Sequence, residues 1–268
     1  MPIATMLEYD FMRHAFLAGS AVAIVAGAVG FFLVLRNLTF AGHALSHVGF
    51  AGATGSVLLG ISPLWGLLAF TLVAAIAMGL FGERLRGRDV AVGIILSLAL
   101  GLGVLFLYLY PTHATQATAI LFGNVLGVSL ETVWSLLGLS VVGLSALAFI
   151  SRPLLFATLA PELAEAKGVS LRLVSVLFLS VVAIAVAEAA QVVGVLLVFA
   201  LMVGPAAASL RLTTRVGLGI GLAVVLALAE TWVGLALAYV TDGPVTFWIV
   251  LVSCVVYFAS AISRPRAT

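Results

Sequence analysis

Charged residues are scarce in this chain of 268 residues: Asp, Glu, Lys and Arg together make up 8% of it. Soluble domains carry about 25% charged residues, because their surfaces need polar cover. Hydrophobic residues make up 64% of the sequence, and the mean hydropathy is +1.32. This composition excludes an ordinary water-soluble enzyme and a disordered chain, and it indicates an integral membrane protein.

Cysteine and lysine are almost absent. The single cysteine, Cys254, has no partner for an intrachain disulfide, so a disulfide scaffold is excluded. The single lysine, Lys167, is followed by Gly168, whereas the lysine of a phosphate-binding loop is followed by Ser or Thr. Any ATP-driven work therefore needs a separate nucleotide-binding subunit. The net charge of +2 does not indicate nucleic acid as a partner.

Long apolar runs take the place of charge. A membrane helix needs about 20 apolar residues to cross about 30 Å of hydrocarbon. The sequence predicts an all-α polytopic membrane bundle of about nine spans, with eight as the alternative, in one transmembrane domain over residues 1–268. The second and sixth spans are short and rich in small residues, so we expect one of them to be broken, tilted or re-entrant. The nine predicted spans are Ala15–Leu35, Ala44–Gly60, Pro63–Gly82, Val90–Tyr110, Thr132–Ile150, Leu173–Ala187, Ala190–Leu210, Val216–Val240 and Pro244–Ile262.

The basic residues predict the orientation of these spans. If the N-terminus is outside and the spans alternate, eleven of the twelve basic residues lie on the inner side and only Arg13 lies outside. Such an asymmetry is the positive-inside bias of membrane proteins. We therefore expect an external N-terminus and a cytoplasmic C-terminus. The inner-side residues are Arg36, Arg84, Arg86, Arg88, Arg152, Lys167, Arg172, Arg211, Arg215, Arg264 and Arg266.

Two histidines in the second span are candidates for binding a metal ion in transit. His43 and His47 are four residues apart, so on a helix they share one face. Neutral imidazole binds Zn²⁺, Mn²⁺ and Fe²⁺, and His47 lies about 16 Å along a helix from Arg36, near the membrane centre. Transport sites are expected at that depth. The alternative is that both histidines only hydrogen-bond neighbouring helices.

Other polar residues in the spans are further candidates. Glu230 lies well inside the eighth span, where an unpaired carboxylate is costly, so it lines the ion pathway or is protonated and bonded to a neighbouring helix. Glu188 and Gln191 fall at the expected hairpin between the sixth and seventh spans, where we expect solvation. Ser46, Gln191 and Pro205 are also candidates for lining the pathway. Two histidines are an incomplete ligand set, so water or other spans must complete it.

A short charged segment follows the fifth span. Pro161 suits the first turn of a helix, Glu162 its positive end and Gly168 its termination. These residues predict a cytoplasmic helix at about residues 158–170, shaped to dock into a groove of another protein, with an ordinary surface helix as the alternative. The histidine pair of the second span is not a zinc-protease motif either, because the residue after His43 is not the Glu that this motif requires. We therefore expect a permease and no enzyme.

Four stretches of the sequence resemble the membrane permeases of ABC-type manganese, zinc and iron importers, the ABC-3 family. The resemblance covers nearly the whole chain, and the four stretches are specific when taken together. They are Val34–His47, Asp89–Ser97, Leu121–Gly127, and Gln191–Val198 with Pro205–Ala207 following it.

This resemblance implies a permease in the bacterial plasma (inner) membrane that forms a homodimer, binds two cytoplasmic ATP-binding subunits and receives metal from an external solute-binding protein. It gives Glu162, Ala164 and Gly168 the role of a coupling helix that contacts the ATP-binding subunit. It also implies that the metal passes His43 and His47. Many members have Asp at the position of His43, and imidazole in place of a carboxylate favours zinc over manganese.

The expected function is therefore ATP-driven import of zinc, manganese or iron by alternating access. The metal is cargo, ATP binds only the partner subunit, and no permanently bound cofactor is expected. Two alternatives remain open from the sequence. One is a secondary metal carrier driven by an ion gradient, and the other is a permease for metal chelates such as siderophores or cobalamin.

Overall fold

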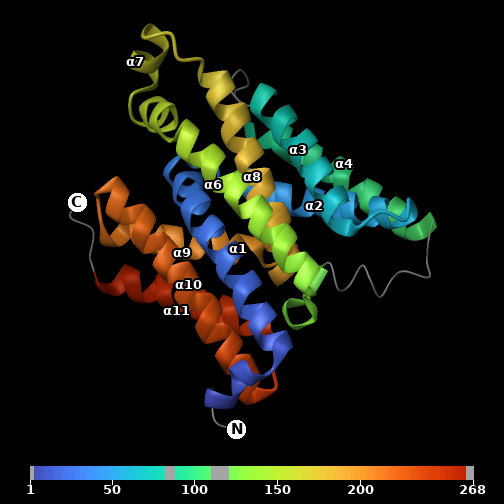
Figure 1. The fold of residues 1–268 in the computed structure, drawn as a ribbon. Coiled ribbons are helices and arrows are strands. Elements are labelled where there is room, and N and C mark those ends of the chain that lie inside the picture. The colour runs from blue at the N-terminus through green and yellow to red at the C-terminus, as the bar shows by residue number, and fades with distance from the viewer. Residues whose placement is uncertain (1–2, 82–87, 110–120, 264–268) are drawn as a thin grey trace.

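The computed structural model describes residues 3–81, 88–109 and 121–263 (Figure 1). Within these ranges the chain is helical and contains no strand. Four of the predicted inner-side basic residues, Arg84, Arg86, Arg264 and Arg266, lie outside the described residues. The elements are η1 (Ile3–Glu8), α1 (Asp10–Leu35), α2 (Thr39–Leu58), α3 (Pro63–Phe81), α4 (Arg88–Leu109), η3 (Val125–Gly127), α6 (Leu130–Leu159), α7 (Pro161–Ala166), α8 (Leu171–Val193), α9 (Val198–Leu212), α10 (Val216–Thr241) and α11 (Val245–Ser263).

Seven of the described helices are long and apolar enough to cross a membrane: α1, α3, α4, α6, α8, α10 and α11. Helices suit the bilayer core because they satisfy their backbone hydrogen bonds internally. The predicted count of nine spans was too high by this measure. The other two predicted spans correspond to α9, which has 15 residues, and to α2, whose apolar sequence is interrupted by histidine, serine, threonine and glycine.

The boundary predicted between the sixth and seventh spans was wrong. Helix α8 continues without a break to Val193, and the chain turns at Gly194, whose φ is +82°. Glu188, expected to be solvated in a hairpin, is fully buried inside the bundle. The Ser140 hydroxyl on α6 donates to Oε2 of Glu188 over 3.1 Å. This bond to a neighbouring helix satisfies Oε2 of the buried carboxyl group, whereas Oε1 has no hydrogen-bond partner among the described residues.

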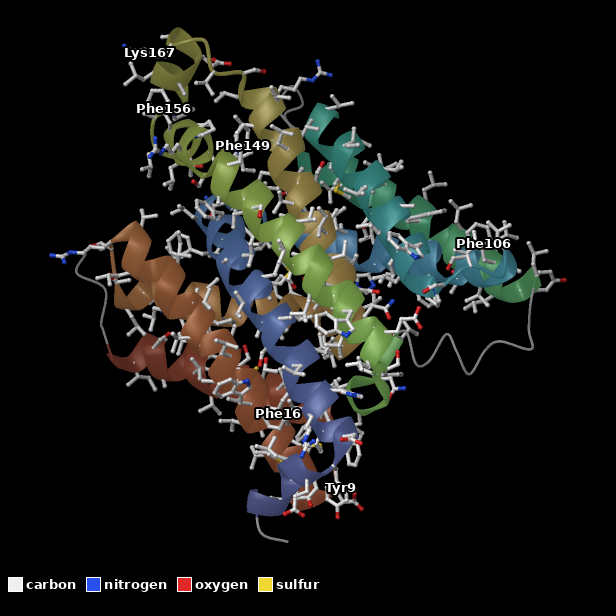
Figure 2. All side chains as sticks on the ribbon, in the orientation of Figure 1. Tyr9, Phe16, Phe106, Phe149, Phe156 and Lys167 are labelled. Carbon is white, nitrogen blue, oxygen red and sulfur yellow. The ribbon has the colours of Figure 1, made fainter. Side chains whose placement is uncertain are left out.

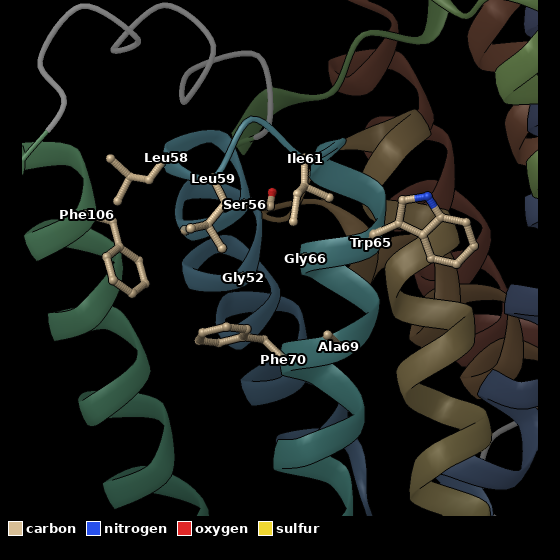
Figure 3. A pocket seen from close by; sticks show the side chains of 11 residues that line it. Gly52, Ser56, Leu58, Leu59, Ile61, Trp65, Gly66, Ala69, Phe70 and Phe106 are labelled. Carbon is tan, nitrogen blue, oxygen red and sulfur yellow. The ribbon is translucent and has the colours of Figure 1, made fainter.

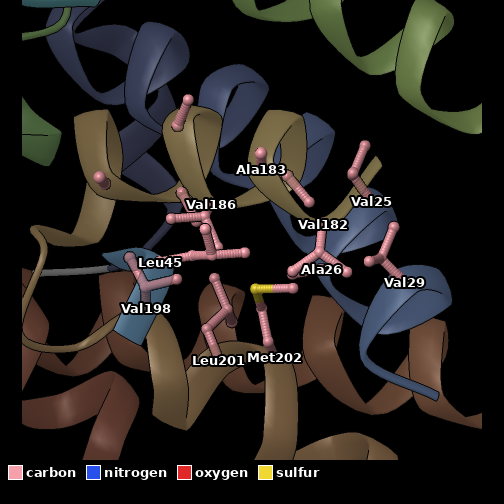
Figure 4. Close-up of a cluster of buried hydrophobic side chains, with 14 of the residues drawn as sticks. Val25, Ala26, Val29, Leu45, Val182, Ala183, Val186, Val198, Leu201 and Met202 are labelled. Atoms are coloured by element: carbon pink, nitrogen blue, oxygen red, sulfur yellow. The ribbon is translucent and has the colours of Figure 1, made fainter. Parts of the chain in front are cut away.

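Helix α1 is the centre of the bundle and the most buried of the seven long helices. It packs against α6 and α8 and against α9 and α10, while α2 packs against α3, α4, α8 and α9 (Figure 1). Figure 4 shows the shared core, in which Leu45 of α2 lies among Val186 of α8 and Val198 and Leu201 of α9. Small residues allow this close packing: a Cβ on Gly30 of α1 would lie 2.0 Å from the Met202 carbonyl oxygen.

Two backbone segments cross closely beside the turn from α8 to α9. Gly123 and Gly194 have φ values of +79° and +82°, and a Cβ on Gly194 would lie 2.3 Å from the Gly123 nitrogen. The Leu196 N–H donates to the Leu121 carbonyl over 3.2 Å. Only glycine fits such a conformation and such an approach without strain. The crossing ties the start of α9 to the segment that precedes α6.

Candidate functional site

His43 and His47 lie together on one face of α2, as their spacing predicts. Their ring centroids are 4.7 Å apart, and the ring planes are nearly perpendicular, at 82°. Both side chains are partly exposed, whereas the residues between them, Ala44, Leu45 and Ser46, are buried. The pair therefore offers ring nitrogens on an accessible face of an otherwise packed helix.

The imidazole pair lies in the middle of its helix. His47 is the ninth residue of α2, which has 20 residues. A rise of about 1.5 Å per residue puts His47 about 12 Å from the first residue of the helix and about 16 Å from the last. A water-soluble ion that reached this pair would have to travel well into the bundle from either end.

Packing on the other faces of α2 fixes the direction of the imidazoles. Leu45 is fully buried in the core shown in Figure 4, and the Ser46 hydroxyl donates to the His43 carbonyl over 2.7 Å. On the side toward α3, a Cβ on Gly52 would lie 2.1 Å from the Gly66 carbonyl oxygen. Rotation of α2 would break these contacts, so the two rings stay on their face because the rest of the helix is packed.

An aromatic side chain that sequence reasoning missed lies against this pair. The Phe199 ring centroid is 5.4 Å from that of His43, and Phe199 is 38% exposed. Phe199 also lines a cavity of about 400 Å³ between α9 and α11, together with Val203, Ser253 and Tyr257. Phe199 therefore contacts the His43 imidazole and also borders this cavity. A phenylalanine in an apolar run carries no sequence signal that distinguishes it from a core residue.

Glu230 lies on α10 and is fully buried. Neither of its carboxyl oxygens has a hydrogen-bond partner among the residues that the structure describes. Ser253 of α11 lies beside it, but the Ser253 hydroxyl donates to the Ala200 carbonyl over 3.2 Å. Over the described ranges, no three or more His, Cys, Asp and Glu side chains gather as metal ligands, so Glu230 does not join the imidazole pair.

The remaining pathway candidates differ in exposure. Gln191 is partly exposed, three residues after the buried Glu188 on α8. Ser46 and Pro205 are buried, and the Ser46 hydroxyl is used within its own helix. In the described part of a single chain, His43 and His47 are therefore the accessible pair of metal-binding side chains at this site.

A larger cavity with an apolar lining lies elsewhere. It has a volume of about 480 Å³ and lies between α2, α3 and α4, where Trp65, Phe70 and Phe106 line it (Figure 3). The lining residues that the structure describes include the Ser56 hydroxyl but no titratable side chain. Its lining suits hydrocarbon, and an ion without its water shell would be unstable there.

The short helix predicted after the fifth span is present as α7, Pro161–Ala166. It is shorter than the predicted residues 158–170 because α6 extends to Leu159 and the chain leaves the helix near Gly168, whose φ is +83°. The Gly168 N–H donates to the Glu165 carbonyl over 2.9 Å. Figure 2 shows Lys167, just after α7, at the opposite end of the molecule from Tyr9.

Burial within α7 divides it into an inner and an outer face. Ala164 is fully buried against the bundle, whereas Leu163 is 52% exposed. Glu162 and Glu165, on the same short helix, are also exposed. An exposed leucine among carboxylates, on a helix that protrudes between α6 and α8, is a surface suited to contact with another protein.

Residues 8–264 match the model of the ABC 3 transport family. The chain belongs to this family. The predicted family is thus confirmed over nearly the whole chain, as is the predicted class of fold, an all-α membrane bundle. Membership also confirms the predicted class of function, a membrane component of an ABC-type transport system.

Relatives of this ABC 3 family chain cover almost its whole length. The manganese transport system membrane protein MntC of Listeria monocytogenes is 28% identical, over 97% of this chain and 93% of MntC. The manganese import system permease protein ScaB of Streptococcus parasanguinis is 31% identical, over 97% of this chain and 92% of ScaB. The solved structure of PsaBC from Streptococcus pneumoniae in complex with Fab has a TM-score of 0.87 at 28% identity, over 98% of this chain and 95% of that chain.

Proposed function

We propose that this ABC 3 family chain is the permease subunit of an ATP-driven importer of a divalent transition-metal ion. The observation that carries the proposal is the accessible pair of imidazoles, His43 and His47, halfway along a helix of a membrane bundle. Imidazole nitrogen is a usual ligand of zinc and iron, and it also binds manganese, for which oxygen ligands are more usual. MntC and ScaB, which are similar over nearly the whole chain, are named for manganese.

Charge supports an orientation with the N-terminus outside and α7 in the cytoplasm. Arg152, Lys167 and Arg172 are exposed near α7, whereas Arg13 lies near the opposite end, beside Asp10 at 3.6 Å. Basic residues are retained on the cytoplasmic side of the plasma membrane. An external binding protein would then deliver the ion at the end of the bundle that includes Tyr9.

A homodimer would complete the ligand set for the ion. One chain offers two imidazoles, and most sites for these ions need four or more ligands. Two copies related by a two-fold axis beside α2 would bring four imidazoles together, with Phe199 of each copy next to them. Neutral ligands suit transport because the ion must bind strongly enough to leave water and weakly enough to be released. Of the other proposed contributors to the wall of the pathway, Gln191 is partly exposed, whereas Ser46, Pro205 and Glu230 would reach the pathway only after the helices move.

The helix α7 is the proposed contact with a cytoplasmic ATP-binding subunit. Glu162, Leu163 and Gly168 would face the partner, while the buried Ala164 holds the helix to the bundle. One ATP-binding subunit for each permease copy would alternate the access of the imidazoles between the two sides. The chain itself supplies the pathway, and the partner supplies ATP hydrolysis.

Reconstitution in lipid vesicles tests this function. The chain is purified together with its ATP-binding subunit, and the uptake of radioactive Mn²⁺ and Zn²⁺ is measured with ATP, without ATP, and with an excess of metal chelates. We expect ATP-dependent uptake of the free ions. Uptake by the isolated chain under a proton gradient, without ATP, would contradict the proposal and favour a secondary carrier. Transport of the chelate in place of the free ion would also contradict it.

A further inference from the structure

The turn between α1 and α2 is short and firmly held. Arg36 caps the end of α1, Asn37 has a φ of +55°, and Leu38 is buried. The Leu38 N–H donates to the Leu33 carbonyl over 2.9 Å, and the Gly42 N–H donates to the Leu38 carbonyl over 3.0 Å. A displacement of this turn would therefore move the start of α2, the helix that holds His43.

The Arg36 side chain joins this turn to the two helices on either side of α7. Its Nη1 donates to the Thr158 hydroxyl and its Nη2 to the Ser175 hydroxyl, each over 3.2 Å. Thr158 is the last residue but one of α6, and Ser175 is the fifth residue of α8. The guanidinium carbon lies 5.8 Å from the centre of the Phe178 ring, also on α8. One side chain thus contacts both helices that support the coupling helix.

The type of residue matters to this arrangement. A guanidinium group is planar and presents several N–H donors at fixed angles, so it can hold two separate acceptors and stack on an aromatic ring at once. A lysine ammonium is a single point of contact. An arginine that served only to mark the cytoplasmic surface would need neither hydroxyl, because it could extend its charge into water.

We propose that Arg36 is a positioning residue that transmits the movement of the α6–α7–α8 hairpin to α2 and its imidazoles. The inference rests on the proposed function, in which an ATP-binding subunit moves α7. When the ends of α6 and α8 shift, Thr158 and Ser175 carry the guanidinium group with them. The short turn after Arg36 then moves α2, so the access of His43 and His47 changes with the state of the ATP-binding subunit.

The test compares coupling in three variants of the full complex. Arg36→Gln removes the guanidinium group, and the double variant Thr158→Val with Ser175→Ala removes its two acceptors while keeping the arginine. Arg215→Gln is the matched control, because Arg215 is an exposed arginine at the start of α10, outside the α6–α7–α8 hairpin. Each complex is reconstituted with the ATP-binding subunit, and both ATP hydrolysis and Mn²⁺ uptake are measured, together with the amount of assembled complex.

We expect Arg36→Gln and the double variant to import about tenfold fewer ions for each ATP hydrolysed, with hydrolysis retained and the control unchanged. An unchanged ratio of ions to ATP in either assembled variant would overturn the inference. If Arg36→Gln fails to assemble, the double variant alone tests the inference. If a variant assembles in lower yield but imports the normal number of ions for each ATP, Arg36 has a purely structural role and the inference is overturned. Absence of ATP-dependent uptake in the unmodified complex would instead overturn the proposed function.

Discussion

The close crossing of Gly123 and Gly194 predicts a large effect of one methyl group. In Gly194→Ala, a residue with a side chain must adopt a φ of +82°, and its Cβ would lie 2.3 Å from the Gly123 nitrogen. The left-handed conformation costs about 1–2 kcal/mol, and overpacking against backbone costs about 1–3 kcal/mol more. We therefore expect Gly194→Ala to lower the free energy of unfolding by about 2–5 kcal/mol.

Gly60 provides a matched control for this prediction. Its φ is +69°, but a Cβ there would meet nothing within 4 Å. Gly60→Ala should therefore show the conformational cost alone, about 1–2 kcal/mol. Denaturant unfolding of the purified chain in detergent micelles, followed by far-ultraviolet circular dichroism, measures both variants. Equal losses in the two variants would refute the close crossing of the backbone segments, because Gly60 shares the positive φ but has no such contact.

Two further substitutions test other contacts. Ser140→Ala leaves the buried Oε2 of Glu188 without its donor, so we expect a loss of about 1–3 kcal/mol in the same unfolding assay; an unchanged stability would contradict the bond. Leu163→Asp places a charge on the exposed apolar residue of α7, and we expect the ATP-binding subunit to co-purify in at most about one tenth of its normal yield. Leu59, just after the last residue of α2, is likewise an exposed leucine, so Leu59→Asp is the control and should retain the ATP-binding subunit. Equal retention of the subunit by both variants would contradict docking at α7.

Local patterns in the sequence predicted the parts of this structure that depend on neighbouring residues. The spacing of His43 and His47 placed both rings on one face, since helical periodicity alone decides that relation. Pro161 and Gly168 marked the ends of α7 for the same reason: proline suits the first turn, and glycine adopts the positive φ that follows the helix. Seven of the nine predicted apolar runs correspond to helices long enough to cross a membrane, because hydrophobic length is a local property.

Features that depend on distant segments could not be predicted in this way. Glu188 looked like a hairpin residue, but Ser140, 48 residues earlier, provides its hydrogen bond inside the bundle. The contact of Phe199 with His43 depends on how α9 packs beside α2. Helix α8 ends at Gly194, and the close approach of this residue to Gly123 depends on a segment far away in the sequence. Tertiary contacts decided each of these positions.

The α6–α7–α8 hairpin and α2 belong to different parts of the sequence, yet Arg36 joins them through side-chain contacts. Such a connection gives alternating access a physical route: the ATP-binding subunit acts on α7, and the imidazoles lie on the helix that follows the Arg36 turn. The route predicts that substitutions along it change the number of ions moved for each ATP, whereas substitutions of the imidazoles change the binding of the ion itself.

Nitrogen coupling to Mn²⁺ tests most directly whether these imidazoles contact the ion. The complex is loaded with Mn²⁺ during turnover and examined by pulsed electron paramagnetic resonance, which detects ¹⁴N ligands of the ion. We expect imidazole nitrogen modulation in the unmodified complex and in His14→Ala, whose histidine lies near the other end of α1, and none in the double variant His43→Ala with His47→Ala. The same nitrogen signal and the same uptake in the double variant would contradict the account.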